Sequence, residues 1–278
     1  MIIINVVVFL VLGILFVFSK ILGFDSIFSV VHDQFSIPPK FVDFILRPWT
    51  IITYAFMHDL YSLFHILFNM IALYWFGRLF IEYLGSDKLI AIYLLGALAA
   101  GFCYLGVFNT IPFFKNQSAF SGMVGASGAI FAIMVAAATL TPNYTFFLLF
   151  FGPVKIKYIA AFYIVLSFLG SVQSNAGGNI AHLGGALMGF VYIKQLQVGV
   201  NWGGWITATL SWFGDLFSSR PKVKVSYRKN ERASEKKGAP LSGISQQEID
   251  DILDKISDGG YESLSKDERE KLFKASKK

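Results

Sequence analysis

The sequence predicts an all-α polytopic membrane protein, and three observations indicate this fold class. Of the 278 residues, 55% are hydrophobic and 15% are charged, whereas roughly 25% of the residues in a typical soluble domain are charged. The mean hydropathy is +0.57. The apolar residues gather in six stretches, most of which approach the ~20 residues that a membrane-spanning helix needs. We therefore expect a bundle of six transmembrane helices.

The six predicted spans are separated by turns and polar loops. They cover residues 2–19, 63–83, 89–108, 122–140, 158–170 and 180–196. The first span lacks the basic residues and the cleavage site of a secretory signal peptide, so we expect it to be retained. The fourth span is rich in glycine and alanine, which let helix backbones approach closely in a bilayer. We expect this span to lie at the centre of the bundle.

The segments between the spans differ in length and character. Residues 25–61 are mixed in polarity and contain three prolines, which predicts a loop with short amphipathic helices at the membrane interface. Residues 144–151 are apolar but too short for a span, and we expect them to be interfacial as well. Residues 171–179 form a polar, glycine-containing loop before the last span.

The chain beyond the predicted membrane domain, residues 1–198, divides into three parts. Residues 199–219 contain three tryptophans, which favours an interfacial helix flanked by an aromatic belt. Residues 220–244 are basic and rich in Gly, Pro and Ser, which is typical of a disordered linker near lipid headgroups. Residues 245–278 contain two Ser-x-x-Glu capping patterns, so we expect a small tail of two short helices.

Lysine and arginine predict the orientation of the spans. They flank the turn between spans two and three and the connection between spans four and five, and they are abundant after span six. Cytoplasmic loops of membrane proteins have such an excess of positive charge. We therefore expect both termini, and the helical tail, to be cytoplasmic. Spans two, four and six then run in the same direction, from the outer face to the inner face.

These three spans carry polar side chains at a similar depth. Ser127 lies about five residues into span four, His182 about two to four residues into span six, and His65 about two to five residues into span two. At roughly 1.5 Å per residue, this depth is about 5–8 Å below the outer edge. Asn69 follows His65 by four residues and shares its helix face. Because polar groups within a bilayer are costly, this set is a candidate functional site.

Acyl transfer is the chemistry that such a set favours. A serine hydroxyl becomes a good nucleophile when an adjacent base accepts its proton, and His182 is the candidate base for Ser127. His65 and Asn69 would donate hydrogen bonds to a developing oxyanion. Ser127 also lies near a helix N-terminus, where free backbone N–H groups favour negative charge.

A purely structural interpretation stays open at this point. Gly-Ala-Ser-Gly in an apolar helix is also a small-residue packing motif, and a lone histidine is often a hydrogen-bonded core residue. We expect His32 and His58, which fall in the loop before span two, to be solvated. The single cysteine, Cys103, and the lack of C-x-x-C and H-E-x-x-H patterns argue against thiol redox chemistry and a metal centre. The sequence predicts no cofactor.

Three motifs, taken together, resemble those of the rhomboid family of intramembrane serine proteases, in its bacterial six-span form. They are His-Ile-Leu-Phe-Asn at 65–69, Gly-Ala-Ser-Gly at 125–128, and Ala181-His182 followed by Gly185 and Gly189. The resemblance extends over about residues 47–194. It implies a six-helix rhomboid-like bundle in a membrane that is, for bacterial members, the inner membrane.

The resemblance also implies a role for individual residues. Ser127 would be the nucleophile and His182 the base, in a dyad without an acidic third member. The oxyanion and substrate site would comprise His65, Asn69, Gly125, Ala126 and the backbone N–H of Ser127. Phe131 stands where many members stack a tyrosine on the base, and Gly128, Gly185 and Gly189 would allow close helix packing.

The substrates implied by the resemblance are single-span membrane proteins that are cleaved near the outer membrane face, with span five and the 171–179 loop as gate and lid. A catalytically silent relative that binds membrane proteins is the alternative. A transporter or channel is disfavoured, because spans two to six contain no carboxylate except Glu82 at an end. The expected partners are membrane-protein substrates and the lipid bilayer, and no pattern predicts nucleic-acid binding.

Overall fold

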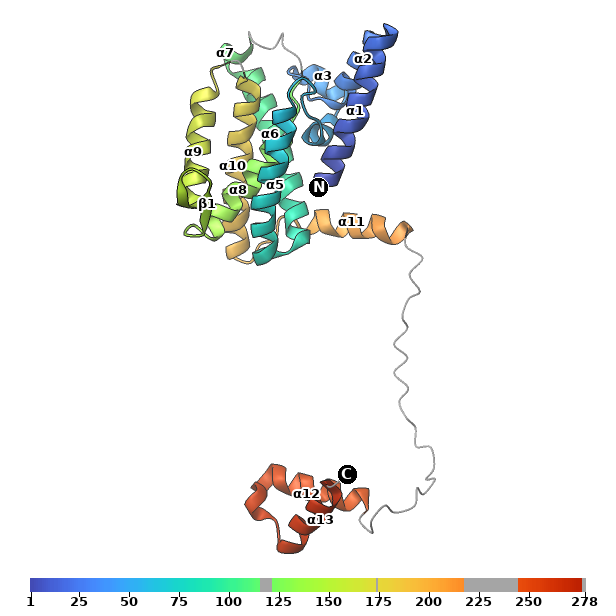
Figure 1. Cartoon of the computed structure of the whole chain (residues 1–278), viewed down its shortest axis with the longest axis vertical. Coiled ribbons are helices and arrows are strands. Elements are labelled where there is room, and N and C mark those ends of the chain that lie inside the picture. Colours follow the sequence, from blue (N-terminus) through green and yellow to red (C-terminus); the bar gives the residue numbers. More distant parts are fainter. Residues whose placement is uncertain (116–121, 174, 218–244, 277–278) are drawn as a thin grey trace. The chain divides into compact units, whose positions relative to one another are not determined.

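The computed structural model describes residues 1–278 except 116–121, 174, 218–244 and 277–278 (Figure 1). The chain divides into two compact units, Met1–Arg220 and Pro221–Lys278. Helices dominate the described residues of both units, and the predicted helical fold class is confirmed. The predicted basic linker, 220–244, lies outside the described residues.

Five helices form the body of the first unit. They are α5 (Leu63–Leu84), α6 (Ser86–Thr110), α8 (Ser127–Leu140), α9 (Ile156–Gly170) and α10 (Ala176–Gln197). Helix α10 packs against α6, α8 and α9, and α8 packs also against α5 and α6 (Figure 1). Every residue from 128 to 138 is buried, so the helix richest in small residues lies at the centre, as predicted.

The N-terminal part adds α1 (Ile2–Leu22), α2 (Asp25–Phe35), α3 (Phe41–Leu46), α4 (Thr50–Thr53) and the 3-10 helix η1 (Tyr54–Phe56). The short helices predicted between residues 25 and 61 are therefore present. Asn5 of α1 is fully buried, and its Nδ2 donates to the Oη of Tyr93 at 3.2 Å. Tyr93 in turn donates to the carbonyl of Ala55 at 2.6 Å. This chain of bonds joins α1, α6 and η1.

Three described helices are long and apolar enough to cross a membrane: α1, α5 and α6. Helices α8 and α9 are apolar but have only 14 and 15 residues. Helix α10 has 22 residues, but glycines, His182 and Asn179 interrupt its apolar character. The membrane character of the protein is thus supported, while the count of six spans stays a prediction.

Glycine allows α8 and α10 to touch along their backbones. A Cβ atom added at Gly185 would lie 1.9 Å from the carbonyl oxygen of Gly128, and one added at Gly189 would lie 2.2 Å from that of Ala132. A Cβ at Gly128 would in turn meet Ala100 of α6 at 2.6 Å. Helices approach this closely only where side chains are absent.

The start of α8 differs from the prediction. The helix begins at Ser127, not near residue 122, because the preceding backbone bonds to the loop before α5 instead. Met123 and Ile37 exchange two backbone hydrogen bonds of 2.9 and 3.0 Å, and the N–H of Gly125 donates to the carbonyl of Tyr54 at 3.0 Å. Ser127 is therefore the first helical residue, and the depth of five residues assigned to it was wrong.

The structure gives the form of two further segments. The segment 144–151 contributes to an antiparallel hairpin of β1 (Thr145–Leu148) and β2 (Gly152–Lys155), and its interfacial position stays a prediction. Helix α10 begins at Ala176, so the loop before it is shorter than 171–179. Helix α7 (Pro112–Lys115) follows α6, and α11 (Gly204–Phe217) agrees with the helix expected within 199–219.

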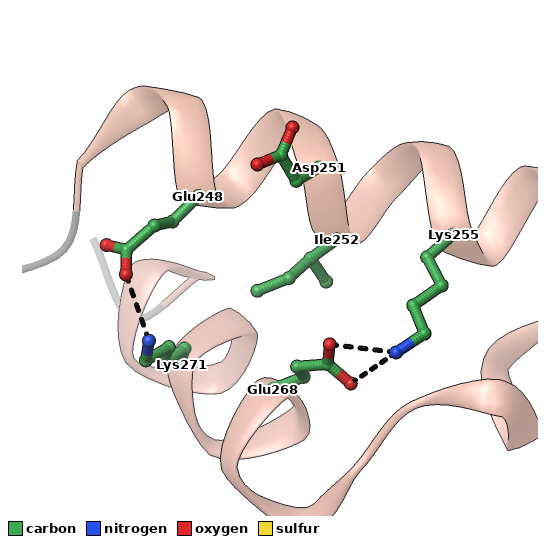
Figure 2. Close-up of a pocket in the computed structure, with 6 residues that line it drawn as sticks. All are labelled: Glu248, Asp251, Ile252, Lys255, Glu268 and Lys271. Carbon is green, nitrogen blue, oxygen red and sulfur yellow. Dashed lines mark hydrogen bonds and ion pairs between the residues drawn. The ribbon is translucent and has the colours of Figure 1, made fainter.

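The second unit is the predicted pair of short helices, α12 (Gln246–Gly259) and α13 (Lys266–Ser276), joined through the 3-10 helix η3 (Tyr261–Ser263). Ser245 and Glu248 form a complete capping box at the start of α12. Two ion pairs connect the helices, between Lys255 and Glu268 and between Lys271 and Glu248, each at 3.0 Å (Figure 2). Ile252, drawn between them, is 5% exposed.

Candidate active site

The first residue of α8 and the seventh residue of α10 meet in a hydrogen bond. The Oγ of Ser127 lies 2.8 Å from the Nε2 of His182, although 55 positions separate the two residues in the chain. The close backbone packing of α8 on α10 brings them together. A hydroxyl and an imidazole at this distance are within reach for direct proton transfer.

The imidazole of His182 is held from two other sides. The ring of Phe131, one turn after Ser127 on α8, stacks on it with centroids 4.1 Å apart and planes inclined by 7°. The Oγ of Ser167 on α9 lies 3.0 Å from its Nδ1. The resemblance implied that Phe131 stacks on His182, as it does. The contact of Ser167 was not predicted, because one serine in an apolar helix has no distinguishing spacing.

His65 of α5 lies against the residues that precede Ser127. A Cβ added at Gly125 would lie 3.4 Å from the Nε2 of His65 and 3.5 Å from the Oγ of Ser127. Gly125 has a φ of 137°, which residues with a side chain rarely adopt. Glycine is therefore favoured here both by the backbone conformation and by the short distance to His65 and Ser127. Ala126, which follows, has no exposed surface.

The hydrogen bonds of His65 indicate which ring nitrogen carries the proton. Its Nδ1 accepts from the backbone N–H of Asp59 at 3.4 Å, so a neutral ring carries its proton on Nε2. This nitrogen is the one that faces Gly125. His65 can therefore donate a hydrogen bond on the side of Gly125 and Ser127.

Asn69 provides a second donor, one turn further along α5. Its side chain is 9% exposed, and its Nδ2 has no hydrogen-bond partner among the described residues. A buried amide without a partner is unfavourable by about 1–3 kcal/mol. Such an arrangement is typical of a donor that becomes paired when a ligand or a charged intermediate arrives.

His58 is not solvated, contrary to the expectation from the sequence. It is 1% exposed, and its ring packs edge-on against His65, with centroids 5.3 Å apart. Within the described part of the chain, neither of its ring nitrogens has a hydrogen-bond partner. Burial lowers the pKa of His58 to about 4, so the ring is neutral near pH 7 and buttresses His65 without adding charge.

The arrangement contains the parts that acyl transfer requires. The Ser127 hydroxyl lies against the imidazole of His182, two neighbours hold that imidazole, and the Nε2 of His65 faces Gly125 from α5. The first turn of α8 adds backbone N–H groups that have no intrahelical acceptor, and the helix dipole there favours negative charge. In the described ranges, no group of three or more His, Cys, Asp or Glu side chains is placed to hold a metal ion.

Comparisons with known proteins identify two matching regions. Residues 46–197 match the family model of the Rhomboid domain, and residues 243–278 match DUF6576, a family of unknown function. The first match contains α5 to α10 and all the site residues described above. The second contains the α12–α13 pair.

Two curated proteins are similar to the first region. RHOMBOID-like protein 12, mitochondrial, of Arabidopsis thaliana is 35% identical over 164 residues, which are 55% of this chain and 48% of that protein. Rhomboid protein 1, mitochondrial, of Saccharomyces cerevisiae is 29% identical over 159 residues, or 54% of this chain and 42% of that protein. The aligned region thus spans less than half of each relative.

Proposed function

The chain belongs to the rhomboid family, since the Rhomboid-domain match covers more than half of its 278 residues, and from this membership we propose that it is a serine-type intramembrane endopeptidase. One observation carries the proposal: the Oγ of Ser127 lies 2.8 Å from the Nε2 of His182. A packing motif would need no base beside the serine, and a core histidine would need no nucleophile.

In the proposed reaction, His182 accepts the proton of Ser127 as the Oγ attacks the carbonyl carbon of a peptide bond. The carbonyl oxygen becomes negative and accepts hydrogen bonds from His65, Asn69 and the backbone N–H of Ser127. In soluble hydrolases, each such donor contributes about 3–4 kcal/mol to the transition state. His182 then gives its proton to the leaving amine, and water attacks the remaining ester.

The substrates we propose are single-span membrane proteins with helix-destabilising residues near the outer face. An intact helix hides its carbonyl groups in internal hydrogen bonds, so a protease of this kind acts where the helix unwinds. Helix α9, whose Ser167 contacts His182, and the loop that follows it are the proposed route of entry.

The proposed topology has six spans, formed by α1, α5, α6, α8, α9 and α10, with both termini in the cytoplasm. The distribution of lysine and arginine supports this orientation. We propose the bacterial inner membrane as the location, because the Pro-Val-Lys-Ile-Lys-Tyr run at 153–158 resembles the corresponding connection of many bacterial members. The names of the two relatives above describe those proteins as mitochondrial, and the proposed location of this chain differs from theirs.

A fluorophosphonate probe tests the proposal directly. The purified wild-type protein should be labelled and should cleave a single-span substrate with Gly or Pro near its outer end. Ser127→Ala and His182→Ala should do neither, while both unfold at the wild-type temperature in detergent. A folded wild-type protein that neither labels nor cleaves would overturn the proposal in favour of a silent, substrate-binding relative.

A further inference from the structure

We infer that Ser167 of α9 is a positioning residue for the proposed reaction: it accepts a hydrogen bond from the Nδ1–H of His182 and so directs the free Nε2 toward Ser127. This inference rests on the proposed function and adds to it a third residue, on a third helix. The role of Ser167 is indirect, because it touches the base and not the reacting atoms.

The geometry places Ser167 where a member of the site should be. It is 3% exposed, and its Oγ lies 3.0 Å from Nδ1, while Ser127 lies 2.8 Å from Nε2 at the opposite edge of the same ring. The Phe131 ring covers one face of the imidazole. The imidazole is therefore constrained in its plane by two hydroxyls and across its plane by stacking.

The direction of the Ser167 bond follows from the chemistry of the ring. To accept the proton of Ser127, Nε2 must be unprotonated, and a neutral imidazole then carries its proton on Nδ1. This N–H donates to the Oγ of Ser167. After the transfer both nitrogens carry protons, and Ser167 keeps the same bond to a ring that is now positive. The proton that arrived from Ser127 leaves with the amine, and the Ser167 hydroxyl remains unchanged.

The surroundings of the ring make Ser167 the relevant acceptor. Within the described ranges, the only hydrogen bonds of the His182 ring are those to Ser127 and Ser167. A carboxylate occupies the Nδ1 position in many soluble serine hydrolases, and here a neutral hydroxyl does.

A second contact links α9 to the base. Tyr163, one turn before Ser167, packs edge-on against Phe131 with centroids 6.2 Å apart. Helix α9 thus supports His182 directly through Ser167 and indirectly through the stacked Phe131. The orientation of the His182 imidazole therefore depends on α9 as well as on α10.

The test compares rates of fluorophosphonate labelling in four full-length proteins: wild type, Ser167→Ala, Ser167→Thr and Ser19→Ala. Ser19 of α1 is a matched control outside the proposed site, since it is buried and its hydroxyl bonds to the carbonyl of Phe16. We expect the rate to fall roughly 10-fold in Ser167→Ala, as one hydrogen bond to a charged group is lost. Ser167→Thr, which keeps the hydroxyl, should recover most of the rate, and Ser19→Ala should label like wild type.

A spectroscopic measurement separates positioning from general structural support. The chain has four histidines, so ¹⁵N-histidine labelling yields few signals, and that of His182 is identified by its loss in His182→Ala. The wild-type signal should report a protonated Nδ1 at neutral pH, and in Ser167→Ala it should move toward a mixture of tautomers. Should Ser167→Ala fail to fold, Ser167→Cys takes its place, since sulfur is a weaker acceptor of similar size.

Two results would overturn the inference: unchanged labelling in Ser167→Ala, or an unprotonated Nδ1 in the neutral wild-type ring. An equal loss in Ser167→Ala and Ser19→Ala, with lowered unfolding temperatures, would assign Ser167 a structural role and would overturn it too. Failure of the proposed function has a different signature, because the wild-type protein would then not be labelled at all.

Discussion

The ring of Phe131 lies parallel to the imidazole of His182, with centroids 4.1 Å apart and an angle of 7° between the planes. One residue lies on α8, a turn after Ser127, and the other on α10. The stacked pair therefore sets the position of the His182 imidazole relative to the helix that carries Ser127.

Phe131 should be replaceable by another flat ring but not by an aliphatic side chain. Aromatic contacts contribute about 0.5–1.5 kcal/mol beyond area burial, which corresponds to about 2- to 10-fold in rate. We expect Phe131→Tyr to cleave substrate within about 3-fold of wild type and Phe131→Leu to be roughly 10-fold slower. Equal rates for the tyrosine and leucine variants would show that flatness of the ring is unimportant.

Asn69 should matter for turnover more than for binding. Its Nδ2 is buried without a partner among the described residues, and in the proposed reaction it gains a hydrogen bond when the oxyanion forms. We expect Asn69→Ala to lower kcat by roughly 10- to 100-fold with little change in KM, somewhat less than for an oxyanion donor in a soluble hydrolase. Asn179→Ala is the control, since that amide bonds to the carbonyl of Gly170. A rise in KM alone would assign Asn69 to ground-state binding instead.

Gly185 should tolerate no side chain. Its Cβ would lie 1.9 Å from the carbonyl oxygen of Gly128, so Gly185→Ala forces α8 and α10 apart. We expect a loss of about 1–3 kcal/mol in the free energy of unfolding, measured in detergent micelles, together with loss of probe labelling. In Gly106→Ala the new Cβ meets no atom within 4 Å, and stability should be unchanged or higher by up to about 1 kcal/mol. Similar stability in both variants would contradict the close contact.

The α12–α13 pair should loosen in acid. The backbone N–H of Ser265 and the ammonium of Lys255 lower the pKa of Glu268 to about 2. Because this folded-state pKa lies below the ordinary value of 4.5, the stabilisation is complete above about pH 4.5 and is lost as the pH falls toward about 2. Amide-exchange protection of α12 and α13 in the full-length chain should fall over this range.

Glu268→Gln should remove most of that pH dependence. Glu270→Gln is the matched control, since Glu270 pairs with Lys274 within α13 and does not link the two helices. A pH dependence that survives Glu268→Gln and disappears in Glu270→Gln would contradict the prediction, because Glu270 would then be the carboxylate responsible.

The sequence predicts that Ser127, His182 and His65 lie at a similar depth, and in the structure the three residues lie close together. The prediction agrees with the structure in this respect because each polar residue lies near the start of its helix. Its error at Ser127, which is the first residue of α8, arose from hydrogen bonds to Ile37 and Tyr54. Partners more than 70 positions away cannot be inferred from local patterns.

By itself, the sequence determined the membrane character, the helical segments and the chemical types of the candidate residues, since apolar runs and capping patterns are local properties. Only the tertiary structure decided which of them touch. It placed Ser167 at the Nδ1 of His182, turned His58 inward against His65, and folded residues 145–155 into a hairpin. The contacts of Ser167 and His58 depend on close packing between separate segments of the chain. The local sequence around a single side chain does not indicate which residue of another segment it will contact.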